Sequence, residues 1–219
     1  MRHSRFWQLA FAVTIASVAI LGLCSGHRLR VRAADEGFVP LGKSLDDFVL
    51  VNTPPETWSF EGDVIKCAGR PNGYLATKKS YRNFVLRFEF KFVRPKGLKN
   101  DWDFRGNSGY LIYITGEHRV WPKCVEVQGM YRQVGRIFAI GGAPRVNARD
   151  YPDVRRRVLK PVGEWNSLEV ISRDGALTAR LNGEVVCESE PGQLKEGPIG
   201  FQSEGAEIHW RNVRIKVLD

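Results

Sequence analysis

The sequence predicts an all-β domain, and three features of the residues after the N-terminal segment support this prediction. The 3.6-residue periodicity of amphipathic helices is nearly absent after residue 34. Short runs that alternate between apolar and polar residues take its place, separated by Gly, Pro, Asn and Asp. Two dipeptides typical of two-residue hairpin turns, Asp174-Gly175 and Asn182-Gly183, lie between such runs. The pattern indicates a β-sandwich or a β-barrel.

The first 33 residues are typical of an export signal. Two arginines precede a charge-free run of 19 residues from Phe6 to Cys24. Val31 and Ala33 stand at the positions that a signal peptidase reads, which predicts a mature chain starting near Ala34 and exported to the periplasm or the extracellular space. The run is close to the length of about 20 apolar residues that spans a membrane, so the sequence leaves open an uncleaved leader that anchors the protein.

The charge balance does not point to nucleic acid. The whole chain has a net charge of +9, but residues 1–33 supply five arginines and no acid, which leaves 28 Lys and Arg against 24 Asp and Glu. The one dense basic cluster, Arg155 to Arg157, is expected to be a solvated loop. Residues 34–219 are enough for a single domain with a sizeable core.

The alternating runs give the expected strands in chain order. They are residues 46–52, a hairpin over 58–69 that turns at 61–63, a short and a long strand over 73–93, then 107–115, 123–130, three strands over 165–189, 197–205 and 206–218. Segment 132–163 is the least regular. A loop of that length in a compact domain is typically functional or contains short helical turns.

Alternation with a period of two also assigns side chains to the two faces of each strand. The core face is expected to bury thirteen residues: Trp58, Phe84, Leu86, Phe88, Phe90, Val125, Val127, Leu168, Val170, Leu181, Ile199, Phe201 and Trp210.

The opposite faces of three strands each carry an acid, namely Glu89, Glu126 and Glu204, and Gln128 and Gln202 accompany the last two. If these strands share one curved sheet, that face is a polar groove. The alternative is an ordinary solvent-exposed face, since one-sided sheets alternate in the same way. For Glu89, which stands between two basic residues on its own face, cross-strand ion pairing is favoured.

Five motifs in register resemble the 3-keto-disaccharide hydrolase domain family, which was long described only as a domain of unknown function. They are NFVLRFEFKF, GNSGYLIYI, VEVQ, GEWNSLEVISRDGALTARLNGEVV and GPIGFQSEGAEIHWRNVRI, and the resemblance covers residues 37–218. It implies a concanavalin-like jelly-roll sandwich of two antiparallel sheets and action on glycosides already oxidised at C3. Many members carry His-Gly where this chain has Glu204-Gly205.

The implied chemistry assigns roles to the polar residues. A ketone at C3 makes the C2 proton acidic, so a carboxylate can remove it, the aglycone leaves from C1, and water then adds. Glu126 is expected to be the base and Glu204 or Glu89 the acid. Candidates for holding the substrate are Asn107, Ser108, Gln128, Tyr131 and Gln202, because amides bond to sugar hydroxyls and aromatic rings cover C–H faces.

Two other functions compete with this one. A retaining glucanase of the same fold needs a second carboxylate close to Glu126, but Gln128 and Met130 follow it on that face of the strand. A non-catalytic carbohydrate-binding or adhesion module would need the same groove and aromatic residues but no base.

No cofactor is predicted. His118 and His209 share no ligand spacing, although a divalent ion on clustered glutamate oxygens stays open. Cys67, Cys124 and Cys187 allow one disulfide at most, and no spacing of theirs suggests a metal site.

Overall fold

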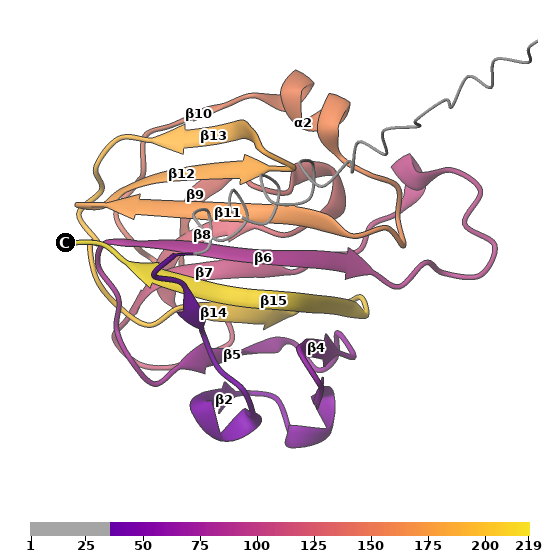
Figure 1. Cartoon of the computed structure of the whole chain (residues 1–219), viewed down its shortest axis with the longest axis horizontal. Helices are drawn as coiled ribbons and strands as arrows, with labels where there is room; N and C mark the ends of the chain where they lie inside the picture. Colours follow the sequence, from indigo (N-terminus) through magenta and orange to yellow (C-terminus); the bar gives the residue numbers. More distant parts are fainter. Residues whose placement is uncertain (1–35) are drawn as a thin grey trace, which may run out of the picture. The chain divides into compact units, whose positions relative to one another are not determined.

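The computed structural model describes residues 36–219, of which Gly37–Asp219 form one compact unit (Figure 1). The expected leader, residues 1–33, lies outside the described residues. Among the residues described, no helix has the length and apolar character needed to cross a membrane.

The unit is a sandwich of two antiparallel sheets. Figure 1 shows the two layers, with β6 and β15 of one sheet in front of β7 and β14 of the other. In the described part of the chain, the larger sheet has nine strands, with β1 paired to β15 beside the main path. The path runs in the order β10 (Ala148–Asp150), β13 (Glu184–Ser189), β12 (Ala176–Leu181), β11 (Asn166–Arg173), β6 (Phe84–Phe92), β15 (Ile208–Val217), β4 (Val64–Cys67) and β3 (Trp58–Glu61), and β1 is Val39–Pro40.

The second sheet has six strands in the order β2 (Phe48–Val51), β5 (Gly73–Thr77), β14 (Gly200–Ser203), β7 (Gly109–Thr115), β8 (Lys123–Gln128) and β9 (Ile137–Ile140). Every expected strand is present, and both hairpin turns lie where the Asp-Gly and Asn-Gly pairs predict them. All four turn residues have positive φ, from 48° at Asp174 to 93° at Gly183, the backbone that Asn, Asp and Gly adopt most readily. The all-β sandwich is confirmed.

The core lies between the sheets and includes the side chains that alternation assigned to it. All thirteen expected residues are buried. Phe88 of the larger sheet packs against Tyr110 and Phe201 of the smaller one, with ring centroids 4.5 and 5.5 Å apart. The aromatic contacts join the two layers directly.

The irregular segment 132–163 holds more structure than the sequence indicates. It contains β9, β10 and the helix α2 (Pro152–Val158), and the short 3-10 helix η4 (Tyr131–Gln133) precedes β9. The basic cluster lies in α2, where Arg155 is only 3% exposed. Its Nε donates to the carbonyl of Val134 at 2.6 Å, and its Nη2 pairs with Asp150. The expectation of a solvated loop is therefore wrong for Arg155, because an ion pair and carbonyl acceptors compensate its burial.

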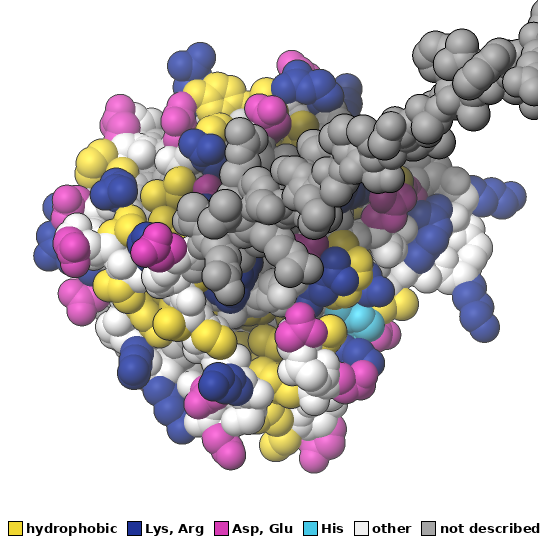
Figure 2. All heavy atoms as spheres, in the orientation of Figure 1, with side chains coloured by type: hydrophobic (Ala, Val, Ile, Leu, Met, Phe, Trp, Pro, Cys, Tyr) yellow, Lys and Arg dark blue, Asp and Glu magenta, His cyan; other side chains and the backbone are white. Residues whose placement is uncertain are grey.

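Three further 3-10 helices join strands: η1 (Leu45–Asp47), η2 (Pro55–Thr57) and η3 (Asp101–Asp103). On the uncovered part of the surface in Figure 2, basic and acidic side chains are interspersed. This mixed surface agrees with the modest charge balance of residues 34–219.

Candidate functional site

Glu126 lies on the outer face of the six-stranded sheet. Its neighbours on the strand, Val125 and Val127, belong to the core between the sheets, so alternation turns Glu126 the other way. Across the strands it is in register with Leu111 on β7 and Phe138 on β9. Leu111 belongs to a second buried cluster on this outer face, which also includes Val51, Tyr74, Ala76, Ile114 and Cys124. The surroundings leave Glu126 only 5% exposed.

A glycine lets two polar side chains converge beside this cluster. Gly109 on β7 is in register with Gln128 on β8. A Cβ atom at Gly109 would lie 1.9 Å from Oε1 of Gln202 and 2.5 Å from Oε1 of Glu126. The space above Gly109 is therefore where the β14 and β8 side chains meet, and any other residue there would push them apart.

Glu204 joins the same site from the residue that follows β14. It forms an isolated bridge with Asn107, two residues before Gly109. The side chains of Trp121 and Asn107 lie near its carboxylate and favour its charged form. Glu204 and Glu126, which the sequence predicts on one shared face, are thus brought together by β8, β14 and the loop before β7.

The two carboxyl groups differ in their affinity for a proton. Burial, and after it the charge of Glu204, raises the pKa of Glu126 from 4.5 to about 8. Burial also raises the pKa of Glu204, although Trp121 and Asn107 oppose that rise. With a pKa of about 8, Glu126 is mostly protonated at neutral pH. Two carboxyls with separated pKa values are the usual basis of acid–base chemistry.

Two buried amide oxygens point to a hydrogen-bond donor at this site. Within residues 36–219, Oε1 of Gln202 and Oδ1 of Asn107 are buried and accept no hydrogen bond. Buried polar atoms are almost always satisfied in proteins, so such atoms call for a partner. A ligand hydroxyl or a protonated carboxyl would supply one.

Glu89 does not share this site. It lies on β6 of the nine-stranded sheet and points away from the core that Phe88 and Phe90 enter. Its carboxylate accepts hydrogen bonds from Arg211 Nε at 2.7 Å and from Asn212 Nδ2 at 2.9 Å. The hydrogen bond from Arg211, its largest influence, lowers the pKa of Glu89.

A bulge in β15 explains why two consecutive residues reach Glu89. The strand register shifts between Arg211 and Arg214, and Asn212 has a φ of 53°. The extra residue turns Asn212 to the same side as Arg211. The expectation that Glu89 joins Glu126 in one groove is wrong, and the alternative of a cross-strand ion pair describes its surroundings.

The remaining predicted residues of the site fall into two groups. Ser108 is fully buried, and its hydroxyl donates to the backbone carbonyl of Gln202 at 2.9 Å. Tyr131 belongs to the core, and its hydroxyl donates to the carbonyl of Lys160 at 3.0 Å. Both support the site without lining it. Gln128 does lie on the outer face, where its Oε1 accepts from the backbone N–H of Met130 at 2.8 Å and fixes the end of β8.

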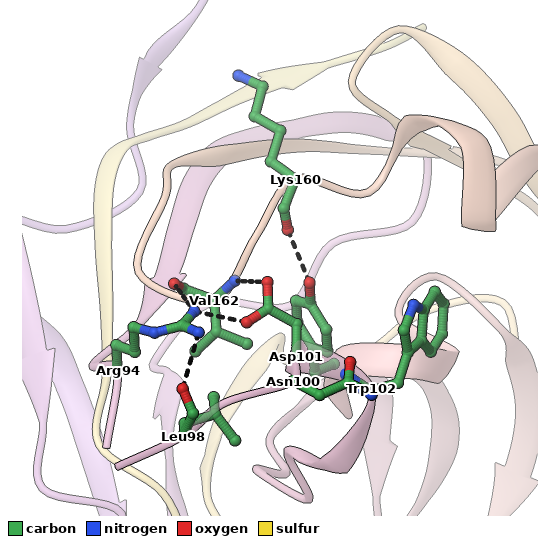
Figure 3. Close-up of polar contacts among 8 residues, drawn as sticks. Arg94, Leu98, Asn100, Asp101, Trp102, Lys160 and Val162 are labelled. Atoms are coloured by element: carbon green, nitrogen blue, oxygen red, sulfur yellow. Dashed lines mark hydrogen bonds and ion pairs between the residues drawn. The ribbon is translucent and has the colours of Figure 1, made fainter. Parts of the chain in front are cut away.

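The loop that carries Asn107 is tied to the segment after α2 (Figure 3). Nη1 of Arg94 donates to Oδ1 of Asp101 at 2.5 Å and to the carbonyl of Val162 at 3.1 Å. The backbone N–H of Val162 donates to the other oxygen of Asp101 at 3.2 Å. This charge-assisted network fixes the base of the loop before β7, at a distance from the acids themselves.

Sequence reasoning gave no specific role to Tyr74 and His118, and it considered Trp121 only as an aromatic residue that flanks the β8 strand. Trp121, in the β7–β8 connection, lies near Glu204 and is 50% exposed. Tyr74, in the second buried cluster, has its hydroxyl 2.9 Å from Nδ1 of His118. No spacing in the sequence links these positions, although an aromatic residue close to the β8 motif was a weak signal for Trp121.

Among residues 36–219, no group of three His, Cys, Asp or Glu side chains is placed to hold a metal ion. The three cysteines of this part of the chain are free and buried. The fold therefore forms without a disulfide among them.

Comparison with known proteins places the chain in a family. A family model described as a 3-keto-alpha-glucoside-1,2-lyase-like domain matches residues 37–216. The chain belongs to this family. The resemblance of the five motifs is thereby confirmed, over nearly the same residues.

Solved structures share the sandwich of this 3-keto-alpha-glucoside-1,2-lyase-like domain. Two candidate glycosyl hydrolases from Parabacteroides distasonis are similar to it. One is 26% identical, with a TM-score of 0.59, over 83% of this chain and 99% of its own. The other is 22% identical, with a TM-score of 0.60, over 85% and 96%. The carbohydrate-binding module CBM66 from Bacillus subtilis is 15% identical, with a TM-score of 0.56, over 78% and 95%. No curated protein sequence matches the chain.

Proposed function

We propose that this protein cleaves glycosides oxidised at C3, with Glu126 and Glu204 as its acid–base pair. The observation that carries the proposal is the convergence of these two carboxyls, of unequal proton affinity, on one outer face of the sandwich. The family to which the chain belongs, described as 3-keto-alpha-glucoside-1,2-lyase-like, supports the choice of substrate class. So does the likeness to a candidate glycosyl hydrolase at 26% identity.

The reaction needs one carboxylate and one carboxylic acid. The carboxylate removes the proton from C2, and the electron pair moves toward the ketone at C3. The C1–O bond then breaks, and the leaving oxygen takes the proton of the carboxylic acid. Water adds to C1 of the resulting enone, and a proton returns to C2. A site that buries one carboxyl in its protonated form and keeps a second one nearby meets both needs at neutral pH.

The amide side chains of the site suit the same substrate. The buried oxygens of Gln202 and Asn107 would accept hydrogen bonds from sugar hydroxyls. Trp121, exposed at the rim and close to Glu204, would cover the C–H face of a sugar ring.

The direct test is incubation of the protein with a 3-keto-glucoside and with its unoxidised parent. We expect release of the aglycone from the keto sugar only. Glu126→Gln and Glu204→Gln should each lower the rate at least about a hundredfold. Glu89→Gln makes the same chemical change on the other sheet and should lower it less than about twofold. Equal cleavage by wild type and Glu126→Gln would remove Glu126 from the chemistry, and equal cleavage of both sugars would show that the ketone has no role.

A carbohydrate-binding module is the second candidate, because an exposed tryptophan beside buried amides also suits binding alone. In that case wild type and Glu126→Gln would bind the keto sugar equally well, as measured by calorimetry, and neither would cleave it.

A further inference from the structure

The outer face of the nine-stranded sheet is strongly basic. Alternation turns ten Lys, Arg and Glu side chains of β4, β6, β11, β12 and β15 away from the core, and eight of them are basic. Arg173 and Arg180 are exposed, and the other six basic residues are half-buried. The eight are Lys66, Arg87, Lys91, Arg173, Arg180, Arg211, Arg214 and Lys216, and the two acids are Glu89 and Glu169.

The other sheet does not share this excess of positive charge. Within the described part of the chain, its six strands hold a single basic residue, Lys123. Residues 34–219 together have 28 Lys and Arg against 24 Asp and Glu, so the whole domain is only mildly basic. Positive charge is therefore concentrated on the side of the sandwich opposite Glu126, and a surface of one sign attracts a partner that carries many opposite charges.

The basic face is hollowed where three of its strands lie side by side. A pocket of about 250 Å³ is lined by Arg87 on β6, Arg180 on β12 and Arg214 on β15, together with Glu89 and Glu169. The Nε of Arg87 donates to Glu169 at 2.5 Å, which holds that guanidinium in place. A guanidinium group presents its N–H donors in a planar fork that matches the oxygens of a phosphate. The pocket therefore suits a phosphate group.

The N-terminal segment joins the domain on this same face. The ring of Phe38 lies 4.4 Å from the guanidinium of Arg87 and 6.0 Å from that of Arg214. A Cβ atom at Gly37 would lie 3.2 Å from Cε of Lys216. Gly37 and Phe38 thus lie over outward-facing basic side chains, directly before β1 pairs with β15.

The segment attached there is the one that contacts a membrane during export. Its charge-free run from Phe6 to Cys24 is followed by residues 25–34, which hold Arg28, Arg30 and Arg32 and no acid. Residues 25–36 reach at most about 40 Å when fully extended, so a leader still in the membrane keeps the domain close to its surface. Basic residues beside a membrane segment favour a surface with anionic lipids.

We propose that the outer face of the nine-stranded sheet docks on a membrane surface that contains anionic phospholipids, with a lipid phosphate in the arginine pocket. Two independent observations carry the proposal, namely the charge of this face and the attachment of the N-terminal segment to it. The site around Glu126 lies on the opposite side of the sandwich and stays open to substrate. The proposal does not depend on the function proposed for that site.

Protection of lysines from a membrane-impermeant amine reagent tests the contact in the full-length protein. The protein is labelled on vesicles of phosphatidylcholine and on vesicles that also contain phosphatidylglycerol. Lys91 and Lys216 should react at least about fivefold more slowly on the anionic vesicles, whereas Lys123 on the other sheet should react equally on both. Raising the salt from about 0.1 M to about 1 M shortens the screening length from about 10 Å to about 3 Å and should abolish the difference.

Arg173→Gln combined with Arg180→Gln removes two exposed charges from the face and leaves both reporter lysines in place. This variant should lose most of the protection, with a change of at least about fivefold in the labelling rates of Lys91 and Lys216 on anionic vesicles. Lys78→Gln combined with Lys79→Gln is the matched control. It removes the same net charge directly after β5 of the other sheet and should change those rates less than about twofold.

Three results would overturn the proposal. Equal labelling on both kinds of vesicle would show that anionic lipid does not engage this face. An equal loss of protection in the control variant would show that net charge, and not this face, drives the binding. Polygalacturonate, an acidic polysaccharide, is the last comparison. If it protects Lys91 and Lys216 while anionic vesicles do not, the partner of the basic face is a polysaccharide and the membrane proposal fails.

Discussion

Replacing Glu126 with Gln should make the stability of this protein fall less between pH 5 and pH 8. The side chain is 5% exposed, and its pKa rises from 4.5 to about 8 on folding, mainly through burial. Above about pH 4.5 the folded protein therefore holds a proton that the unfolded chain has released. Stability from this group is fully present below the unfolded pKa and falls as the pH rises, until the folded protein also loses the proton near pH 8.

The size of the effect follows from the same shift. One proton of difference changes the free energy of unfolding by about 1.36 kcal/mol for each pH unit. From pH 5 to pH 8 the loss due to Glu126 is about 4 kcal/mol at most. That is a large part of the 5–15 kcal/mol that stabilises a typical domain. Gln is neutral and close in size to the protonated acid, so Glu126→Gln should be nearly as stable as wild type at pH 5 and clearly more stable at pH 8.

Urea unfolding followed by tryptophan fluorescence at pH 5, 6, 7 and 8 measures the difference, provided that the slope m stays constant. Glu89→Gln is the control, because ion pairing lowers the pKa of Glu89 and its contribution changes only at more acidic pH. The control should follow the wild-type trend from pH 5 to pH 8. Parallel curves for wild type and Glu126→Gln would show that Glu126 titrates normally, and the acid–base argument built on its burial would fail.

Two substitutions and one sequencing experiment test the fold, the site and the leader. Phe88→Ala should cost about 3–5 kcal/mol of unfolding free energy in urea titrations, because the ring is buried between both sheets; a cost under about 1 kcal/mol would contradict its place in the core. Gly109→Ala should lower the free energy of unfolding by ~1–3 kcal/mol, because the methyl group would occupy the place where Gln202 and Glu126 converge. For the same reason it should lower the rate of cleavage of the keto sugar by at least about tenfold. A variant with both the stability and the rate of the wild type would show that the site has room for the methyl group. N-terminal sequencing of the native protein should begin near Ala34, whereas an intact Met1 on membrane-bound protein would show a retained anchor.

Local pattern was enough to predict most of the strands, the two hairpin turns and the two faces of the predicted strands. Alternation is a property of each strand alone, so the burial of Phe88 and the outward direction of Glu126 could be predicted from a few neighbouring residues. The hairpin turns were equally local, because Asn-Gly and Asp-Gly favour the positive φ that those turns require. The convergence of Glu126, Gln202 and Glu204 was predicted only on the condition that their strands share a sheet.

Local pattern cannot predict which strands share a sheet. Alternation says that Glu89 points outward, but it does not say from which sheet, and long-range pairing put β6 and β8 in different layers. The sequence allowed short helical turns in residues 132–163, but it could not show that α2 buries Arg155, because the partners that compensate its charge lie on other elements.

The sequence by itself determined the all-β class, the core, and the outward direction of the two acids that we place in the site. Only the tertiary structure decided which acids meet, that Gly109 makes room for their contact with Gln202, and that Trp121 and Asn107 lie near Glu204. The physical reason is that a strand's two faces depend on its own residues. Burial, hydrogen bonding and the pKa of a carboxyl depend on side chains brought together from distant parts of the chain.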